Sequence, residues 1–163
     1  MIHHQMFFVA QAQGFVAEWI NVVGAITTAD SIERVSSGAI WESGGMFNQP
    51  IIADGYIEFV HDSGRFMAGL AGLNSVANYS SISHAIFFNN SNFQVFENGT
   101  NKGVYGTILA GDKLRVQRTG STVEYKKNGV VLYTSLLPSN GNVFFDCSLR
   151  DTGAKIKEIE IGE

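Results

Sequence analysis

The sequence predicts an all-β protein, a two-sheet antiparallel jelly-roll sandwich, and three observations lead to this prediction. Helical periodicity is nearly absent, while short runs of Val, Ile, Phe and Tyr alternate with turn residues. The composition includes 18 Gly and 12 Phe but only 2 Pro, which suits short strands joined by tight turns. No repeat of fixed period occurs, so neither a propeller nor a solenoid is expected.

The strand-forming runs follow one another about every ten residues, as in a sandwich. The first, residues 7–20, fits a helical spacing as well as a strand, and a strand is favoured because the rest of the chain is β. The later runs cover residues 17–25, 31–35, 56–60, 65–70, 84–88, 93–97, 104–109, 112–118, 123–134, 144–149 and 155–161. Together they predict roughly eleven to thirteen strands.

The clearest local signal is Asn128-Gly129 between two β-prone runs. Both central residues of a two-residue hairpin turn need positive φ, which Asn and Gly accept. Such a turn places Lys127 opposite Val130 and, further along, Tyr125 opposite Leu132 and Glu124 opposite Tyr133. Alternation then predicts two faces. Val123, Tyr125 and Leu132 face the core, and Glu124, Lys126, Val131 and Tyr133 face outward.

The last run breaks its own alternation. Ile156 and Ile159 are three residues apart, whereas Ile159 and Ile161 are two apart. A β-bulge near Lys157-Glu158 would bring all three side chains to one face. We therefore predict a bulge there.

Length, charge and cysteine content restrict the class of protein. With 163 residues, 45% of them apolar and 16% charged, the chain suits one globular domain over residues 1–163. The net charge of −4 and the lack of a basic run argue against a nucleic-acid partner. No apolar stretch of about 18 residues occurs, so no membrane insertion is expected. Cys147 is the single cysteine, which excludes an internal disulfide, and we expect it to be buried.

The sequence offers no recognisable catalytic arrangement. It has no carboxylate pair set along one strand as a glycosidase needs, and no Gly-x-Ser-x-Gly elbow. His61 lies among turn residues, and His84 lies in a strand pattern, where we expect an ordinary half-buried side chain. We therefore expect a non-catalytic protein. Bound Ca²⁺ is possible, because oxygen ligands from separate loops leave no motif, and no other cofactor is indicated.

Several segments in order resemble a bacterial domain family with the concanavalin A-like lectin/glucanase fold, with SPRY-like motifs near the C-terminus. The segments are Trp19-Ile20-Asn21, Trp41-Glu42-Ser43-Gly44-Gly45, Asp54-Gly55-Tyr56-Ile57-Glu58-Phe59, Gly111-Asp112-Lys113-Leu114 and Tyr125-Lys126-Lys127-Asn128-Gly129. The resemblance implies a binding module of a larger extracellular, cell-surface or virion-surface protein. It implies carbohydrate as the commonest ligand.

A sugar site needs an aromatic platform and polar groups for the hydroxyls. The hairpin register favours Tyr133 as the platform, with Glu124 and Lys126 beside it on the outer face. Other candidates are Trp19, Trp41 and Tyr79 as platforms, and Asn89, Asn90, Asn92 and Asn98 as polar contacts. The main hypothesis is a module that binds a glycan or polysaccharide. The alternative is a protein-binding adhesin or phage receptor-binding domain that uses its end loops as SPRY domains do.

Overall fold

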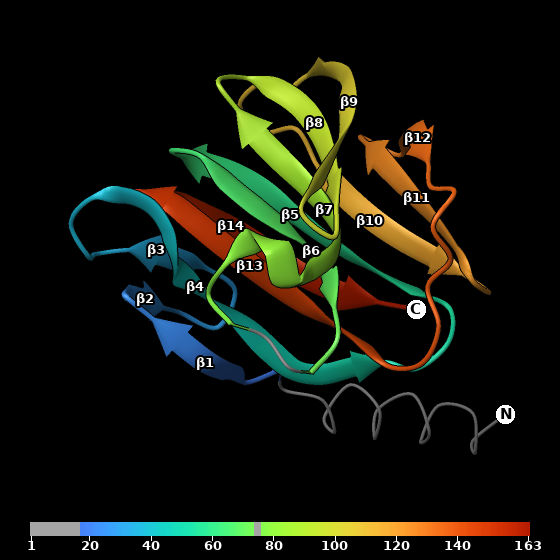
Figure 1. The fold of residues 1–163 in the computed structure, drawn as a ribbon, viewed down its shortest axis with the longest axis horizontal. Coiled ribbons are helices and arrows are strands. Elements are labelled where there is room, and N and C mark those ends of the chain that lie inside the picture. The colour runs from blue at the N-terminus through green and yellow to red at the C-terminus, as the bar shows by residue number, and fades with distance from the viewer. Residues whose placement is uncertain (1–16, 74–75) are drawn as a thin grey trace, which may run out of the picture.

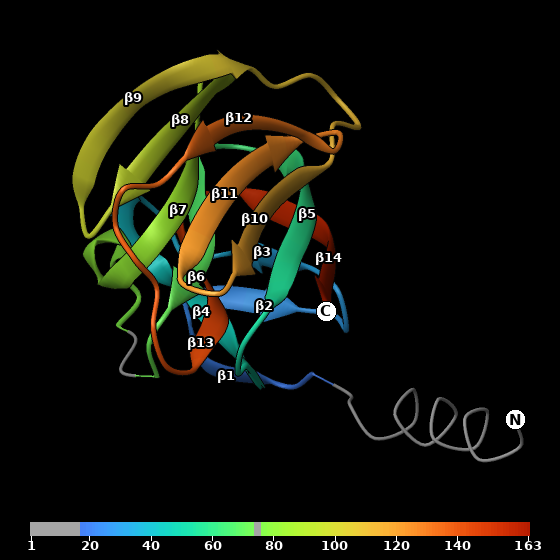
Figure 2. The same cartoon turned by 90° about the vertical axis from the view of Figure 1, so that its right-hand side faces the viewer.

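The protein is a sandwich of two antiparallel sheets, seen edge-on in Figure 2. The structure is a computed structural model and describes residues 17–73 and 76–163. Within these residues it has 14 strands and one short 3₁₀ helix, which confirms the predicted all-β jelly-roll sandwich. Most of the predicted first strand, residues 7–16, lies outside the described residues, and β1 begins at Trp19.

Each sheet has seven strands, and the chain crosses between the sheets repeatedly (Figure 1). The first sheet has the order β1 (Trp19–Val23), β4 (Ala39–Ile51), β13 (Val143–Asp151), β6 (Phe66–Ala71), β7 (Ile82–Asn89), β8 (Asn92–Glu97) and β9 (Thr100–Thr107). The second has the order β12 (Val130–Thr134), β11 (Thr122–Lys127), β10 (Leu114–Thr119), β5 (Gly55–Ser63), β14 (Lys155–Gly162), β3 (Ile32–Arg34) and β2 (Ala25–Thr27). The 3₁₀ helix η1 (Tyr79–Ser81) lies between β6 and β7.

The core fills the space between the sheets with alternate residues of each strand. Phe66 and Leu70 of β6 meet Ile57 and Phe59 of β5 in one fully buried cluster. Trp19 packs against this cluster, and its indole nitrogen donates a hydrogen bond to the Thr28 carbonyl at 2.7 Å. This makes Trp19 a packing residue of the sandwich.

Two finer predictions are confirmed. Cys147 is buried, and its thiol donates to the Gly45 carbonyl at 3.3 Å, with burial raising the pKa of the thiol. In β14 the register shifts between Lys157 and Glu160, with Glu158 at a φ of 52°. The bulge lets both Ile156 and Ile159 enter the core.

The hairpin prediction is right at the turn and wrong two residues beyond it. Asn128 and Gly129 have φ of 50° and 80°, and the pairs Lys127–Val130 and Lys126–Val131 form as expected. Leu132 is then an extra residue in β12, so that Tyr125 lies opposite Tyr133. A bulge of one residue reverses the faces of everything that follows it.

The bulge turns Tyr133 toward the sandwich interior instead of outward. Its ring centroid lies 4.5 Å from that of Tyr105 on β9 and 5.7 Å from that of Tyr125. Strands β9 and β12 are the edges of different sheets, and in Figure 2 both lie at the same side of the sandwich. Stacking two tyrosine rings between these edges buries apolar area that an outward Tyr133 would leave in water, which is the physical reason for the correction.

Candidate functional site

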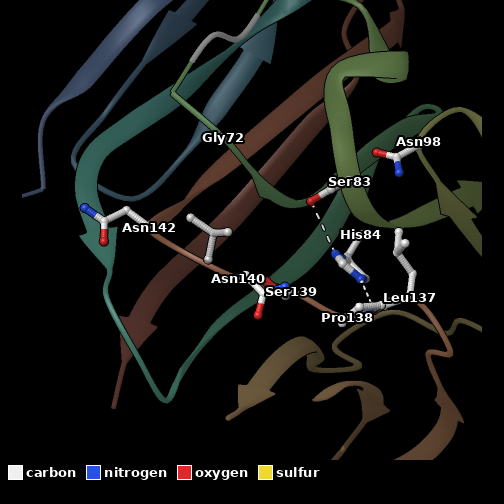
Figure 3. Close-up of a pocket in the computed structure, with 10 residues that line it drawn as sticks. Gly72, Ser83, His84, Asn98, Leu137, Pro138, Ser139, Asn140 and Asn142 are labelled. Atoms are coloured by element: carbon white, nitrogen blue, oxygen red, sulfur yellow. Dashed lines mark hydrogen bonds between the residues drawn. The ribbon is translucent and has the colours of Figure 1, made fainter. Parts of the chain in front are cut away.

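A cavity of about 270 Å³ opens at one end of the first sheet (Figure 3). Its walls come from the end of β6, the start of β7, the turn between β8 and β9, and the segment that leads from β12 in one sheet to β13 in the other. The lining residues are Gly72, Ser83, His84, Asn98, Leu137, Pro138, Ser139, Asn140, Asn142 and Val143. We call this cavity the end pocket.

The end pocket is polar but carries no acidic, lysine or arginine side chain among its lining residues. Three of the lining residues are the exposed asparagines Asn98, Asn140 and Asn142. Each amide offers two donors and an acceptor. The Ser83 hydroxyl already donates to the Leu70 carbonyl at 2.7 Å, and the Ser139 hydroxyl accepts from Arg118. The three amides can bind a ligand that both donates and accepts hydrogen bonds and has no net charge.

His84 supports the wall of the end pocket that the segment between β12 and β13 forms, because its ring bonds to Leu137. It is 1% exposed, with Nε2 2.9 Å from the Leu137 carbonyl and Nδ1 3.2 Å from the Ser83 hydroxyl. Burial lowers the pKa of His84, so the ring is neutral at pH 7 and donates from Nε2 to the carbonyl. Because Nε2 donates to the Leu137 carbonyl and the ring is buried, His84 positions the wall. It is also fully buried, where the sequence predicted a half-buried residue.

Arg118 fixes the same wall through bonds to Ser139 and Gly141. Its guanidinium, 2% exposed, donates to the Ser139 hydroxyl at 3.2 Å and to the Gly141 carbonyl at 2.7 Å. Its remaining bonds go to the carbonyls of Ile51, the last residue of β4, and Ala53, which follows that strand. Burial lowers the pKa of Arg118, which nevertheless stays charged. The pocket wall is therefore preformed although it has no secondary structure of its own.

The structure brings Trp41 and Tyr79 together, as part of a cluster on the outer face of the first sheet. The ring centroids of Trp41 and Tyr79 are 5.3 Å apart, and Phe87 lies 5.4 Å from Trp41. Phe96 contacts both Tyr79 and Phe87. The rings pack edge to face, so each partly covers the next, and this arrangement is that of a small satellite core.

Of the four asparagines named from the sequence, only Asn98 lines the end pocket. Asn89 pairs with Asn92 across a two-residue turn whose residues, Asn90 and Ser91, have φ of 51° and 71°. This turn is at the opposite end of β7 from Ser83 and His84. The asparagines there serve a tight hairpin turn, and their part in ligand binding stays a prediction.

Glu124 and Lys126 lie on the outer face of the second sheet, as predicted, but Tyr133 is not beside them because it faces the interior. Lys126 Nζ donates to Gln117 Oε1 at 3.0 Å. Next to them, Arg115 donates to Glu58 at 2.8 Å and lies 3.5 Å over the ring of Tyr56. The Tyr56 ring is thus already covered by a cation, and this face is an internally paired polar surface.

Sequence reasoning missed Asn140, Asn142, Ser83 and Ser139. The available signal was the turn composition Pro138-Ser139-Asn140-Gly141-Asn142, since binding residues are often carried on loops fixed by a rigid scaffold. The signal is weak because the same residues mark any turn.

Among residues 17–73 and 76–163, no group of three or more His, Cys, Asp or Glu side chains could hold a metal ion. Asp112, an acidic residue of a turn, accepts bonds from the Leu109 N–H and the Asn128 amide, which lower its pKa and occupy it in the hairpin. Ca²⁺ binding stays a prediction. No helix of the described chain is long and apolar enough to cross a membrane.

No protein-family model matches this chain, and no curated protein matches it. Solved structures do. The SPRY domain of human HERC1 matches with a TM-score of 0.67 and 13% identity, over 85% of this chain and 93% of that one. The carbohydrate binding module CBM66 from Bacillus subtilis matches with a TM-score of 0.59 and 14% identity, over 89% and 95%.

The exoplasmic/lumenal domain of VIP36, solved with Ca²⁺ and Man3GlcNAc, matches with a TM-score of 0.59 and 9% identity, over 90% of this chain and 83% of that one. These identities are low, so the likeness concerns the fold. The shared fold is a jelly-roll sandwich, found here in a SPRY domain, in a carbohydrate binding module and in a domain solved with Man3GlcNAc, and a shared fold does not fix function.

Proposed function

We propose that this protein is a non-catalytic binding domain whose end pocket takes one uncharged, hydroxyl-rich unit of a glycan, such as a terminal sugar residue. The observation that carries the proposal is the lining of the end pocket, with three exposed amides and no charged carboxylate or ammonium group. A sugar ring presents hydroxyls that donate and accept, which match the donors and acceptors of the amides.

The size of the end pocket supports a single unit. Its volume of about 270 Å³ is below the roughly 300–1,000 Å³ of pockets for drug-sized ligands. The wall is held by His84 and Arg118 before ligand arrives, which reduces the entropy lost on binding. Such a module would act at a cell or virion surface as part of a larger protein.

A protein partner is the second candidate, favoured by the apolar residues next to the end pocket. Leu136 is 94% exposed and adjoins Leu137 of the lining, and Leu73 is 61% exposed and adjoins Gly72. Exposed leucines around a polar pocket would suit a peptide that places one amide or hydroxyl side chain in the pocket. Glycan binding ranks first because the pocket interior itself is polar.

The test is a screen of the purified domain on soluble glycans and insoluble polysaccharides, followed by calorimetry with the best ligand. We expect Asn140→Ala and Asn142→Ala each to weaken binding about fivefold, because one neutral hydrogen bond contributes roughly 1 kcal/mol. Asn89→Ala, at the far end of β7, serves as the matched control and should bind like the wild type. The titrations are repeated with Ca²⁺ and with EDTA.

Other outcomes would assign the binding site to a different part of the domain. Loss of binding in Trp41→Ala, with Asn140→Ala unaffected, would place it on the outer face of the first sheet. Loss only in Lys126→Ala would place it on the second sheet. No glycan bound at all, with binding to peptides that Leu136→Ser abolishes, would establish the protein-binding alternative.

A further inference from the structure

Residues 76–81, which we call the strap, lie over the outer face of the first sheet, beside Asp146 and Ser148 of β13. Figure 1 shows this short helical turn in front of β6. The Ser148 hydroxyl donates to the Ala77 carbonyl at 2.7 Å. Within the strap, the Ser81 hydroxyl donates to the carbonyls of Val76 and Asn78. The bond from Ser148 therefore joins the strap to the sheet, and the aromatic cluster around Tyr79 lies at its side.

Asp146 is a buried carboxyl group with an unpartnered oxygen next to the strap. The residue is 2% exposed, and its Oδ2 has no hydrogen-bond partner in the part of the chain that the structure describes. The other interactions of the carboxyl are with the Cys147 N–H and the Ser81 hydroxyl. In β6 and β4 its cross-strand partners are Gly69 and Met46, which carry no charge.

No described cation offsets a negative charge at this position. The groups that act on the carboxyl are its own burial, the Cys147 backbone and Ser81, with no lysine, arginine or histidine among them. The neighbouring titratable group is the Cys147 thiol, which is neutral because burial raises its pKa. The strap adds Tyr79 and no lysine, arginine or histidine. An ionised Asp146 would thus be a buried charge without a cation beside it, and the bonds from the Cys147 N–H and the Ser81 hydroxyl do not outweigh the burial. Such a charge is costly in free energy.

The strap also adjoins the end pocket. A side-chain atom placed on Gly99 would lie 3.4 Å from Ser80 and 3.9 Å from the Tyr79 ring. Gly99 follows Asn98, which lines the end pocket, and the Asn98 N–H donates to the Ser83 carbonyl at 3.2 Å. A movement of the strap would therefore change the surroundings of the pocket rim at Asn98.

We propose that Asp146 is a proton-controlled latch for the strap. With a neutral Asp146 the strap lies on the sheet, and with an ionised Asp146 the strap lifts, so that water reaches the carboxylate and the aromatic cluster. A change in pocket affinity with strap position rests, in addition, on the proposed function of the end pocket.

The direction of the pH effect follows from the burial. Burial raises the pKa of Asp146 to about 8, far above the value of about 3.9 in an unfolded chain. The folded state then keeps a proton that the unfolded state loses, so the stability contributed by neutral Asp146 is complete below about pH 4 and declines as the pH rises toward 8. Lifting of the strap ends this decline, because it gives the charge access to water.

The experiment uses the fluorescence of Trp41, which contacts Tyr79 of the strap. Replacing the other tryptophan, Trp19→Phe, makes Trp41 the single reporter in a chain with 2 Trp. Between pH 6 and 9.5 we expect a reversible red shift of emission with a midpoint near 8, and no change in the circular dichroism of the strands. Acrylamide quenching should rise over the same range.

Asp146→Asn, which keeps the shape and cannot ionise, should abolish the transition. Asp112→Asn, which removes an equal charge in the turn between β9 and β10, should leave it unchanged. Ser148→Ala should lower the midpoint, because it removes a bond that holds the strap. The latch is overturned by constant Trp41 emission over this range in the parent, or by an unchanged transition in Asp146→Asn. Neither readout needs a ligand, so failure of the glycan proposal would leave this test intact.

Discussion

Gly69→Ala is expected to destabilise the protein by at least about 3 kcal/mol, because overpacking against fixed backbone cannot relax by a rotamer change. Gly69 lies in the middle of β6, with Ala85 of β7 on one side and Asp146 of β13 on the other. A Cβ at this position would lie 1.7 Å from the His84 carbonyl oxygen. The two central strands would have to separate. Urea denaturation followed by circular dichroism measures the loss.

Gly45→Ala is the matched control within the same sheet. The three atoms nearest to a Cβ there are side-chain atoms of Ile32, Trp19 and Val22, each at 3.2 Å, and these can shift by a few tenths of an ångström. We expect a loss of roughly 1 kcal/mol or less from this smaller adjustment. Equal losses in the two variants would show that the close approach of β6 to β7 is not the cause.

Arg118→Met is expected to reduce stability by roughly 3–5 kcal/mol and to abolish ligand binding by the end pocket. The substitution keeps the apolar stem and removes the guanidinium. Four oxygens, those of Ile51, Ala53, Gly141 and the Ser139 hydroxyl, then lose a charged donor at once. The segment that carries Asn140 and Asn142 is released. Thermal unfolding and calorimetry with the glycan identified in the screen measure the two effects.

Arg34→Met separates stability from binding. Arg34 is an equally buried arginine, and its guanidinium donates to the carbonyls of Ser36, Ser37, Ile40 and Leu149. Leu149 is toward the end of β13 remote from Val143 and the end pocket. We expect a similar loss of stability with an unchanged affinity of the folded protein. Equal loss of affinity in both variants would mean that Arg118 acts on binding only through global stability.

The elements of this fold follow from local chemistry, so the sequence predicts them well. Asn128-Gly129 specifies a hairpin turn because both residues accept positive φ, and the spacing of Ile156 and Ile159 specifies a bulge because alternation must be restored. The pairing of β11 with β12 beyond Val131 could not be predicted from local sequence. It depends on Tyr105, 28 residues away in the chain, which gives the Tyr133 ring a partner in the other sheet.

In the candidate site, too, local sequence indicates individual residues, and contacts between distant segments decide which of them come together. From the sequence, Trp41, Tyr79 and the asparagines are separate candidates, and only the fold brings Trp41 against Tyr79 and leaves Asn89 at the far end of β7 from Asn98. The end pocket joins segments from four parts of the chain, and its wall is held by His84 and Arg118, which no local pattern marks as supports.

The sequence by itself determined that this protein is a β-sandwich, that Asn128-Gly129 forms a hairpin turn and that Cys147 is buried. It could do so because the φ values of turns and the alternation of strands depend on near neighbours in the chain. The tertiary structure alone decided where a ligand could bind and which polar groups would be buried without a partner. Burial of Asp146 and convergence of Asn98, Asn140 and Asn142 depend on which strands become neighbours, and that is set by long-range packing of two sheets.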